Sequence, residues 1–157
     1  MIPEWTNKYI EIPFLEHGRT PDGLDCWGLM YLIYNLEFEI SIPSYKDDYD
    51  TTDDLYSIEL AIEHERSGWY EFPLGSEKLG DVILFSIRGA NRHVGLVVGD
   101  GYMLHIMEGT EVTLERYKAI KWVNRIAGIY RHEKMLDWNC TDIPWDDGAA
   151  VDFGITG

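Results

Sequence analysis

The sequence contains few cysteines and few basic residues. Only two cysteines, Cys26 and Cys140, occur among 157 residues, and because they lie far apart in unlike settings we expect no disulfide between them. The 13 Lys and Arg residues are outnumbered by 28 Asp and Glu residues, which gives a formal net charge of −15. A surface this negative repels phosphate backbones, so we expect no nucleic-acid partner.

Long apolar runs and phosphate-binding loops are also missing. No uninterrupted run of about 18 apolar residues occurs, so we expect no membrane partner. The first residues lack the basic stretch and apolar run of an export signal, which predicts synthesis without a signal peptide. No Gly-rich loop stands between a strand and a helix, so nucleotide chemistry has no support.

The N-terminal half predicts one strong helix. With 157 residues, of which 45% are hydrophobic, the chain can build a single domain around one core. A segment rich in Pro and Gly comes first and predicts an irregular arm. Asp22 or Asp25 would then cap a helix that is buried along one face. Its apolar residues recur at three- and four-residue spacing: Cys26, Leu29, Met30, Ile33 and Leu36.

A second, peripheral helix is predicted from about Leu55 to Arg66, and the rest of the chain predicts strands. Short β-branched and aromatic runs are separated by Gly, Asp and Asn in the second half, at 81–87, 93–99, 101–107, 111–117 and 126–131. We therefore expect an α+β domain over residues 1–132, in which an antiparallel sheet packs on the N-terminal helix that carries the cysteine. Residues 133–157, which are acidic and without periodicity, are expected to form an extended or disordered tail.

Cys26 lies in the first turn of the predicted helix, within Gly23-Leu24-Asp25-Cys26-Trp27-Gly28-Leu29. Unpaired backbone amides and the helix dipole favour an anion at this position, so we expect a lowered thiol pKa. The same amides can donate to the oxyanion that forms when a thiolate attacks a carbonyl carbon. A buried, inert cysteine is the alternative interpretation of this segment alone.

The placement of two histidines favours the nucleophile. His93 opens one predicted strand and His105 lies in the next, with a hairpin turn at residues 99–101 between them. A three-residue loop with Gly101 in the left-handed region would place Gly95 opposite His105. Both histidines would then share a sheet face as diagonal neighbours, roughly 7 Å apart at Cα. A two-residue turn would send them to opposite faces.

Two imidazoles on one face, with the second fixing the tautomer of the first, would complete a nucleophile, a base and an orienting group. The remaining histidines lie among charged residues and are expected to have core or surface roles: His17, His64 and His132.

With these residues in view, the sequence resembles the NlpC-type cell-wall cysteine peptidases, in particular the short members of phage tails and gene transfer agents. The resemblance implies a papain-like fold in which Cys26 attacks an amide carbonyl, His93 takes its proton and His105 orients His93. It implies D-glutamyl to diaminopimelate bonds of peptidoglycan stems as substrate, and no metal or cofactor. The matching segments follow the family's order: residues 9–14, 23–29, 43–45, 79–85, 93–98, 103–105 and 129–131.

The resemblance also implies further site residues and a location. Phe14 stands where many relatives carry a tyrosine that helps to form the oxyanion site, so Tyr9 is the candidate hydroxyl. Trp27 and Arg92 are candidates for substrate binding, although Trp27 could pack inward and Arg92 could be merely solvated. The chain would be made in the bacterial cytoplasm and become part of a virion tail, with tail-tip proteins as its partners.

Three alternatives remain open from the sequence. Cys26, His93 and His105 are good zinc ligands, but no closely spaced ligand pair such as CxxC or HExxH accompanies them. The fold could instead serve tail assembly, or process only a partner protein. The chain could also be a peptidoglycan-degrading effector that a dedicated secretion apparatus exports.

Overall fold

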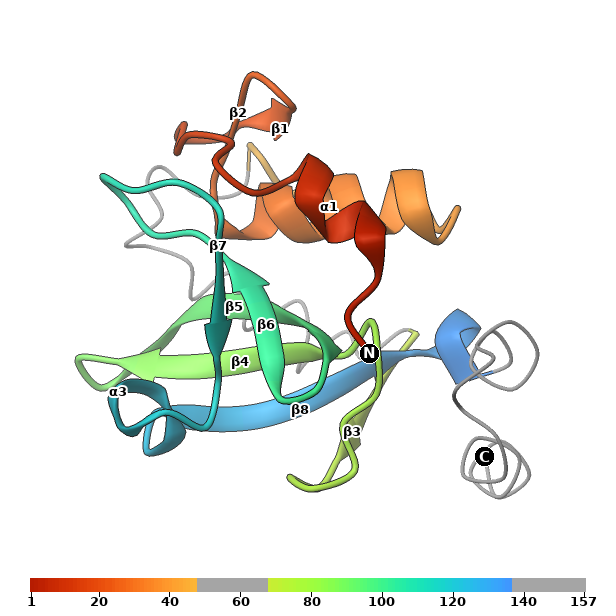
Figure 1. Ribbon diagram of the computed structural model, residues 1–157, viewed down its shortest axis with the longest axis vertical. Helices are drawn as coiled ribbons and strands as arrows, with labels where there is room; N and C mark the ends of the chain where they lie inside the picture. Colours follow the sequence, from red (N-terminus) through yellow and green to blue (C-terminus); the bar gives the residue numbers. More distant parts are fainter. Residues whose placement is uncertain (48–67, 137–157) are drawn as a thin grey trace.

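The structure, a computed structural model, describes residues 1–47 and 68–136 (Figure 1). The helix predicted at 55–66, His64, Cys140 and the tail from residue 137 lie outside the described residues. The elements in chain order are η1 (Glu4–Lys8), β1 (Arg19–Thr20), β2 (Gly23–Leu24), α1 (Cys26–Glu37), β3 (Trp69–Phe72), β4 (Val82–Ile87), β5 (Ala90–Gly99), β6 (Tyr102–His105), β7 (Thr113–Arg116), α3 (Ile120–Val123) and β8 (Ile126–His132). No helix within the described ranges is long and apolar enough to cross a membrane.

Helix α1 begins at Cys26, as predicted. Asp25 is the N-cap, and its side chain accepts a 2.8 Å hydrogen bond from the backbone amide of Gly28. Most of the predicted apolar stripe is buried, but Leu36 is 53% exposed, so its assignment to the buried face was wrong. At about 100° per residue, position 36 lies about 80° around the helix axis from position 26, at the edge of the stripe.

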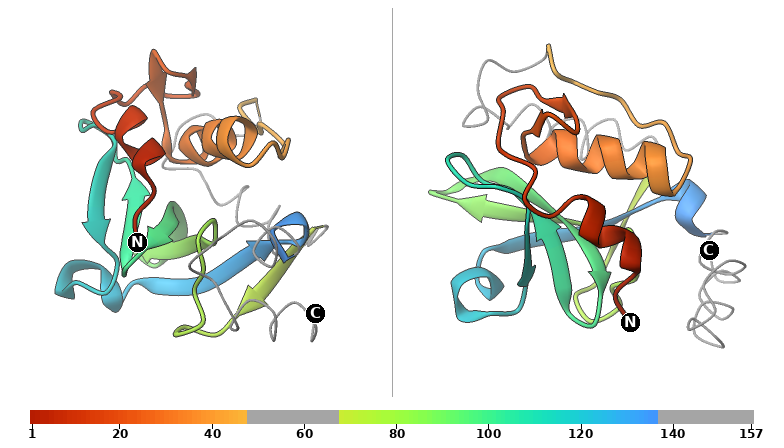
Figure 2. Two further views of the ribbon diagram at one scale, coloured as in Figure 1. Left: turned by 45° about the vertical axis from the view of Figure 1, so that its right-hand side comes forward. Right: turned by 45° about the horizontal axis from the view of Figure 1, so that its top comes forward.

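The predicted α+β fold is confirmed by a six-stranded sheet in the order β3-β8-β4-β5-β6-β7, in which every neighbouring pair is antiparallel. Figure 2 shows that the sheet is bent and that α1 packs to one side of it. Val94 and Leu96 of β5 join α1 in the larger core cluster. Side chains of the opposite face, such as Phe85 and Met103, form a second cluster with Trp122 of α3.

The hairpin between β5 and β6 has a shorter turn than we expected. Asp100 (φ 56°) and Gly101 (φ 83°) both adopt positive φ, and Gly99 pairs with Tyr102. This is a two-residue turn of the kind that suits twisted antiparallel strands. The three-residue loop was therefore the wrong prediction. On its own, the shorter turn would place the two histidines on opposite faces of the sheet.

A β-bulge restores the predicted arrangement. The register shifts between Val97 and Gly99, and Val97 pairs with Met103 beyond the shift. One extra residue on β5 reverses the alternation of side chains, so that His93 and His105 share a face after all. The bulge thus has the effect on register that the longer loop was expected to have.

The N-terminal arm is more ordered than predicted. It contains η1 and the short β1-β2 pair. Residues 11–14, between η1 and β1, form backbone hydrogen bonds with the loop that follows β6. The Glu11 amide donates to Val112 O (3.0 Å), the Val112 amide donates to Ile12 O (2.9 Å), and the Phe14 amide donates to Thr110 O (3.1 Å). These bonds hold the chain that leads into Cys26 against the sheet.

The end of β8 is held by a buried ion pair, and packing continues beyond it. Arg131 donates from Nε to Asp81 Oδ1 (2.6 Å) and from Nη2 to Asp81 Oδ2 (2.7 Å), with both side chains fully buried. After β8, residues 133–136 form a helical turn. Met135 in this turn is fully buried in the main core. The core therefore extends past the domain boundary expected at residue 132.

Candidate active site

Cys26 is enclosed where α1 meets β5. It is the first residue of the helix, carries a free thiol and is only 2% exposed. Backbone hydrogen bonds from Val94 and Trp27 reach the sulfur. Val94 is the residue after His93, so the strand that carries one predicted histidine also contacts the predicted nucleophile.

The Cys26 thiol does not have the lowered pKa that its helix position predicts. Burial raises the pKa of the thiol, and the negative charge of Asp25 raises it further. The backbone bonds and the nearby Arg19, which pairs with Asp25 at 2.8 Å, act in the opposite direction and do not compensate. The expectation was wrong because the loss of hydration destabilises the thiolate more than one helix terminus stabilises it. In this closed form, Cys26 is a neutral thiol.

His93 and His105 meet as predicted. Nε2 of His93 lies 3.0 Å from Nδ1 of His105, and each residue is 4% exposed. Trp122 stacks on His93 with ring centroids 5.5 Å apart and meets His105 edge-on at 5.1 Å. Burial, followed by the charges of His105 and Lys121, lowers the pKa of His93 to about 3. Both rings are therefore held in a dry environment that favours neutral imidazoles.

Glu115 is a member of the cluster that the sequence did not reveal. Its Oε1 lies 2.7 Å from Nε2 of His105, the ring nitrogen that does not face His93. In the register of β6 and β7, His105 pairs with Thr113, which places Glu115 diagonally across from it. The connection of residues 106–112 is too long for its length alone to set this register, so the sequence carried no usable signal.

The pKa values of His105 and Glu115 are both lowered, for different reasons. Burial lowers the pKa of His105, although the hydrogen bond and charge of Glu115 act to raise it. Burial acts to raise the pKa of Glu115, but the hydrogen bonds with His105 and Trp122 and the charges of His105 and Lys121 together outweigh it, and the pKa is lowered. Glu115 is thus a carboxylate near neutral pH, and it is in contact with a neutral imidazole.

Tyr9 does not lie where an oxyanion group is needed. Its hydroxyl donates a 2.6 Å hydrogen bond to Oε2 of Glu37, the last residue of α1. Cys26 begins the same helix, and at about 1.5 Å per residue the two ends are about 16 Å apart. The assignment of Tyr9 was wrong because the arm runs alongside α1 and brings this side chain to the opposite end of the helix.

Trp27 packs inward and does not line a substrate cleft. It is fully buried, donates from Nε1 to Pro43 O at 2.8 Å and packs against the ring of Trp69. Its side chain turns away from solvent, so its candidacy for substrate binding was wrong. Arg92 precedes His93 in β5, but its side chain lies outside the part of the chain that the structure describes.

The two other histidines of the described ranges have structural surroundings. His17 donates its backbone amide to Asp25 Oδ2 at 3.0 Å. His132 is 8% exposed and packs edge-on against the ring of Trp69. Both observations agree with the surface and core roles expected for these residues.

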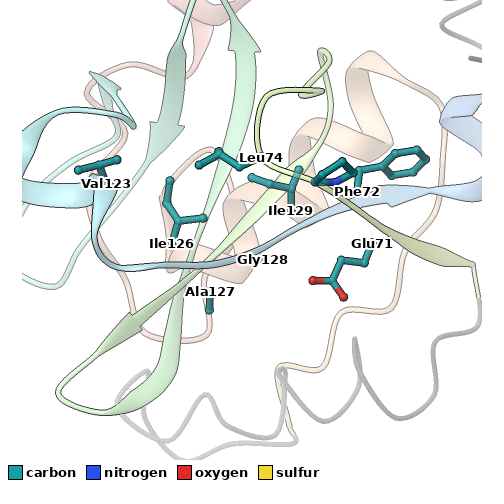
Figure 3. A pocket seen from close by; sticks show the side chains of 9 residues that line it. Glu71, Phe72, Leu74, Val123, Ile126, Ala127, Gly128 and Ile129 are labelled. Carbon is teal, nitrogen blue, oxygen red and sulfur yellow. The ribbon is translucent and has the colours of Figure 1, made fainter.

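The candidate residues are not exposed in either of two surface hollows. A pocket of about 220 Å³ lies between the segment after β3 and the start of β8, where Phe72, Leu74 and Ile126 line it (Figure 3). A second hollow, of about 170 Å³, lies beside the β5-β6 turn. Neither is lined by Cys26, His93 or His105. No group of three or more His, Cys, Asp or Glu side chains within residues 1–47 and 68–136 is placed to hold a metal ion.

Known proteins are similar in sequence to this chain. It matches the NlpC/P60 family over residues 11–131. It is 31% identical over 152 residues to tail tip assembly protein K of Escherichia phage lambda, an alignment that covers 94% of this chain and 73% of that protein. It is also 31% identical over 100 residues to gamma-D-glutamyl-L-lysine dipeptidyl-peptidase of Bacillus subtilis, covering 62% of this chain but only 28% of that protein.

Solved structures show the same fold. An NlpC/P60 family protein from Bacillus cereus superposes with a TM-score of 0.60 at 22% identity, covering 84% of this chain and 41% of that one. The NlpC/p60 domain of the peptidoglycan hydrolase SagA superposes with a TM-score of 0.54 at 21% identity, covering 79% of this chain and 89% of that one. The second comparison aligns most of this chain with a single domain of that fold.

Proposed function

Since this chain belongs to the NlpC/P60 family, we propose that it is a cysteine hydrolase that cleaves peptide bonds of bacterial peptidoglycan. Cys26 is the nucleophile, His93 is the base and His105 orients His93. The observation that carries this proposal is the 3.0 Å contact between the two imidazoles. In β5, His93 is followed by Val94, whose backbone hydrogen-bonds to the Cys26 sulfur.

The contacts leave one nitrogen of His93 for the thiol. Consecutive Cα atoms are about 3.8 Å apart, so the bond from Val94 to the sulfur keeps the His93 backbone beside Cys26. Nε2 of His93 is occupied by His105, which leaves Nδ1 as the basic atom. A neutral thiol next to a neutral imidazole is a resting state from which proton transfer starts when substrate binds.

The reaction then proceeds by ordinary acyl transfer. The Cys26 thiol gives its proton to Nδ1 of His93 as the sulfur attacks the amide carbonyl carbon, and the Trp27 amide is a candidate donor to the oxyanion. His93 returns the proton to the leaving nitrogen when the C–N bond breaks, and a thioester remains. Water attacks the thioester and gives one proton to His93, which passes it to the sulfur as the C–S bond breaks. The thiol is restored, and the product leaves as a carboxylic acid that releases its proton to solvent.

The names of three relatives support a proposal for the bond and the location. Two Bacillus subtilis relatives are named for γ-glutamyl bonds, as a gamma-D-glutamyl-L-lysine dipeptidyl-peptidase and a gamma-DL-glutamyl hydrolase. They support cleavage at the D-glutamyl to diaminopimelate bond of stem peptides. The phage lambda relative is named for tail tip assembly, which supports a place in a virion tail tip.

The test compares two cysteine variants on one substrate. Purified peptidoglycan is incubated with the protein, with Cys26→Ala and with the matched control Cys140→Ala, and new amino termini are identified by mass spectrometry. We expect cleavage by the protein and by Cys140→Ala, and none by Cys26→Ala. Cleavage that survives in Cys26→Ala would refute the mechanism.

A structural role in tail assembly is the second candidate, and the closed site favours it. Cys26, His93 and His105 are each 4% exposed or less, so a substrate carbonyl reaches the sulfur only after the surrounding chain moves. If neither the protein nor Cys140→Ala releases new termini, while Cys26→Ala still restores particle assembly, the assembly role is the correct one.

A further inference from the structure

Both ring nitrogens of His105 form contacts, and the contact with Glu115 affects the contact with His93. Nδ1 faces Nε2 of His93 at 3.0 Å, and Nε2 faces Oε1 of Glu115 at 2.7 Å. We propose that Glu115 is a positioning residue that fixes which ring nitrogens carry protons in the relay Glu115–His105–His93, so that Nδ1 of His93 is left unprotonated. This role rests on the proposed function, because Nδ1 is the atom that takes the proton of Cys26.

The argument begins with the carboxylate. An ionised carboxylate only accepts hydrogen bonds, so the proton between Glu115 and His105 must lie on Nε2 of His105. A neutral imidazole has one N–H, and Nδ1 of His105 is therefore the acceptor. His93 then donates from Nε2, and its own single proton is used there. Nδ1 of His93 keeps its lone pair.

Without the carboxylate, the opposite arrangement becomes available. His105 could carry its proton on Nδ1 and donate to Nε2 of His93, which would require His93 to be protonated on Nδ1. That tautomer cannot accept a proton from the thiol. Both histidines are 4% exposed, so water does not readily exchange one arrangement for the other. The charge at the end of the relay selects the productive one.

The charge also acts on the base once it is protonated. An imidazolium is costly in a buried site, and a carboxylate two rings away offsets part of that cost. The charged groups around the pair are Glu115 from β7 and Lys121 from α3, which act in opposite directions on His105. The Glu115 side chain is 32% exposed, so its effect is partly screened by solvent.

The proton arrangement can be read directly, without activity. In protein labelled with ¹⁵N-histidine, we expect His93 and His105 each to carry the proton on Nε2 near neutral pH, in both the wild-type protein and Cys26→Ala. In Glu115→Gln the amide can donate as well as accept, so we expect a mixture or reversal of tautomers. Protonated Nδ1 in the wild-type pair, or an unchanged pattern in Glu115→Gln, would overturn the proposal.

Kinetics separate positioning from simple support. We expect Glu115→Gln to lower kcat by about 10-fold or more with little change in KM, because a wrong tautomer blocks proton transfer and does not affect binding. The acid limb of the rate profile should move to lower pH, because the charge that favours imidazolium is gone. Glu115→Asp should recover part of the rate. A loss that is the same at every pH and that Asp does not relieve would contradict the positioning role.

A matched charge change controls for the acidic surface. Glu108→Gln alters an exposed carboxylate in the loop between β6 and β7, and we expect it to leave kcat and the pH profile unchanged. If the wild-type protein cleaves no substrate, the proposed hydrolase function fails, whereas the ¹⁵N signals still decide the role of Glu115. The two failures are therefore distinguishable.

Discussion

His105 lies 3.0 Å from His93 although twelve positions separate them in the chain. The two strands that carry them are joined by a two-residue turn, and only the bulge between Val97 and Gly99 turns both rings to the same side of the sheet. The candidate site therefore depends on one additional residue in β5, together with a closed environment that keeps both rings and the Cys26 thiol neutral.

The buried thiol should resist alkylation. In a Cys140→Ser background, we expect iodoacetamide to label Cys26 at least about 10-fold more slowly in the folded protein than in urea at the same neutral pH. The reason is that burial both excludes the reagent and raises the pKa of the thiol. Mass spectrometry of timed samples measures the rates, and equal rates in both states would contradict the closed site.

Stability should fall as the pH drops below neutrality. The pKa of His93 is lowered to about 3 in the folded state, so from about pH 6.5 downward the unfolded chain binds the proton and the folded chain does not. His93 then contributes to the free energy of unfolding a slope against pH that approaches about 1.4 kcal/mol per pH unit. His105 and His132, whose pKa values are also lowered, act with the same sign.

Urea unfolding at pH 7, 6 and 5 measures this slope. We expect the free energy of unfolding to decrease across the series, and the decrease to be smaller in His93→Gln, which cannot titrate. Asn35→Gln, a change at an exposed position that does not titrate, is the control, and we expect it to keep the wild-type slope. A slope in His93→Gln equal to that of the wild-type protein would contradict a neutral His93.

Replacing one partner of the buried Asp81–Arg131 pair should destabilise the protein strongly. Arg131→Met leaves a buried carboxylate without its bidentate partner, and we expect a loss of about 3–5 kcal/mol in the free energy of unfolding. The double variant Asp81→Leu/Arg131→Met should lose much less than the two single losses combined, since no uncompensated charge remains. Additive losses in urea unfolding would contradict this coupling.

Gly28 should not tolerate a side chain. Alanine normally stabilises a helix relative to glycine by about 1 kcal/mol, but a Cβ here would overlap the backbone carbonyl of Gly18 and lie close to Arg19. We expect Gly28→Ala to destabilise the protein by about 1–3 kcal/mol, the usual range for overpacking. Asn35→Ala, at an exposed position of the same helix, should be neutral or slightly stabilising.

The sequence by itself determined the class of the fold, the start of α1 and the hairpin whose strands carry the two histidines. Helical spacing and an Asp cap define the segment from Cys26, and alternating strands with a Gly-Asp-Gly turn define the hairpin. These are local properties, set by residues that are close in the chain. The same local patterns also identified Cys26 as the residue at the head of the helix.

Only the tertiary structure determined the pKa shifts at the site and the contacts of Tyr9 and Glu115. Burial reversed the expected shift of the Cys26 pKa, because desolvation depends on every element that packs around the sulfur. The arm carried the Tyr9 hydroxyl to Glu37, and the register of β7 brought Glu115 to His105. Contacts between distant segments depend on how the whole chain packs, and no local pattern in the sequence encodes them.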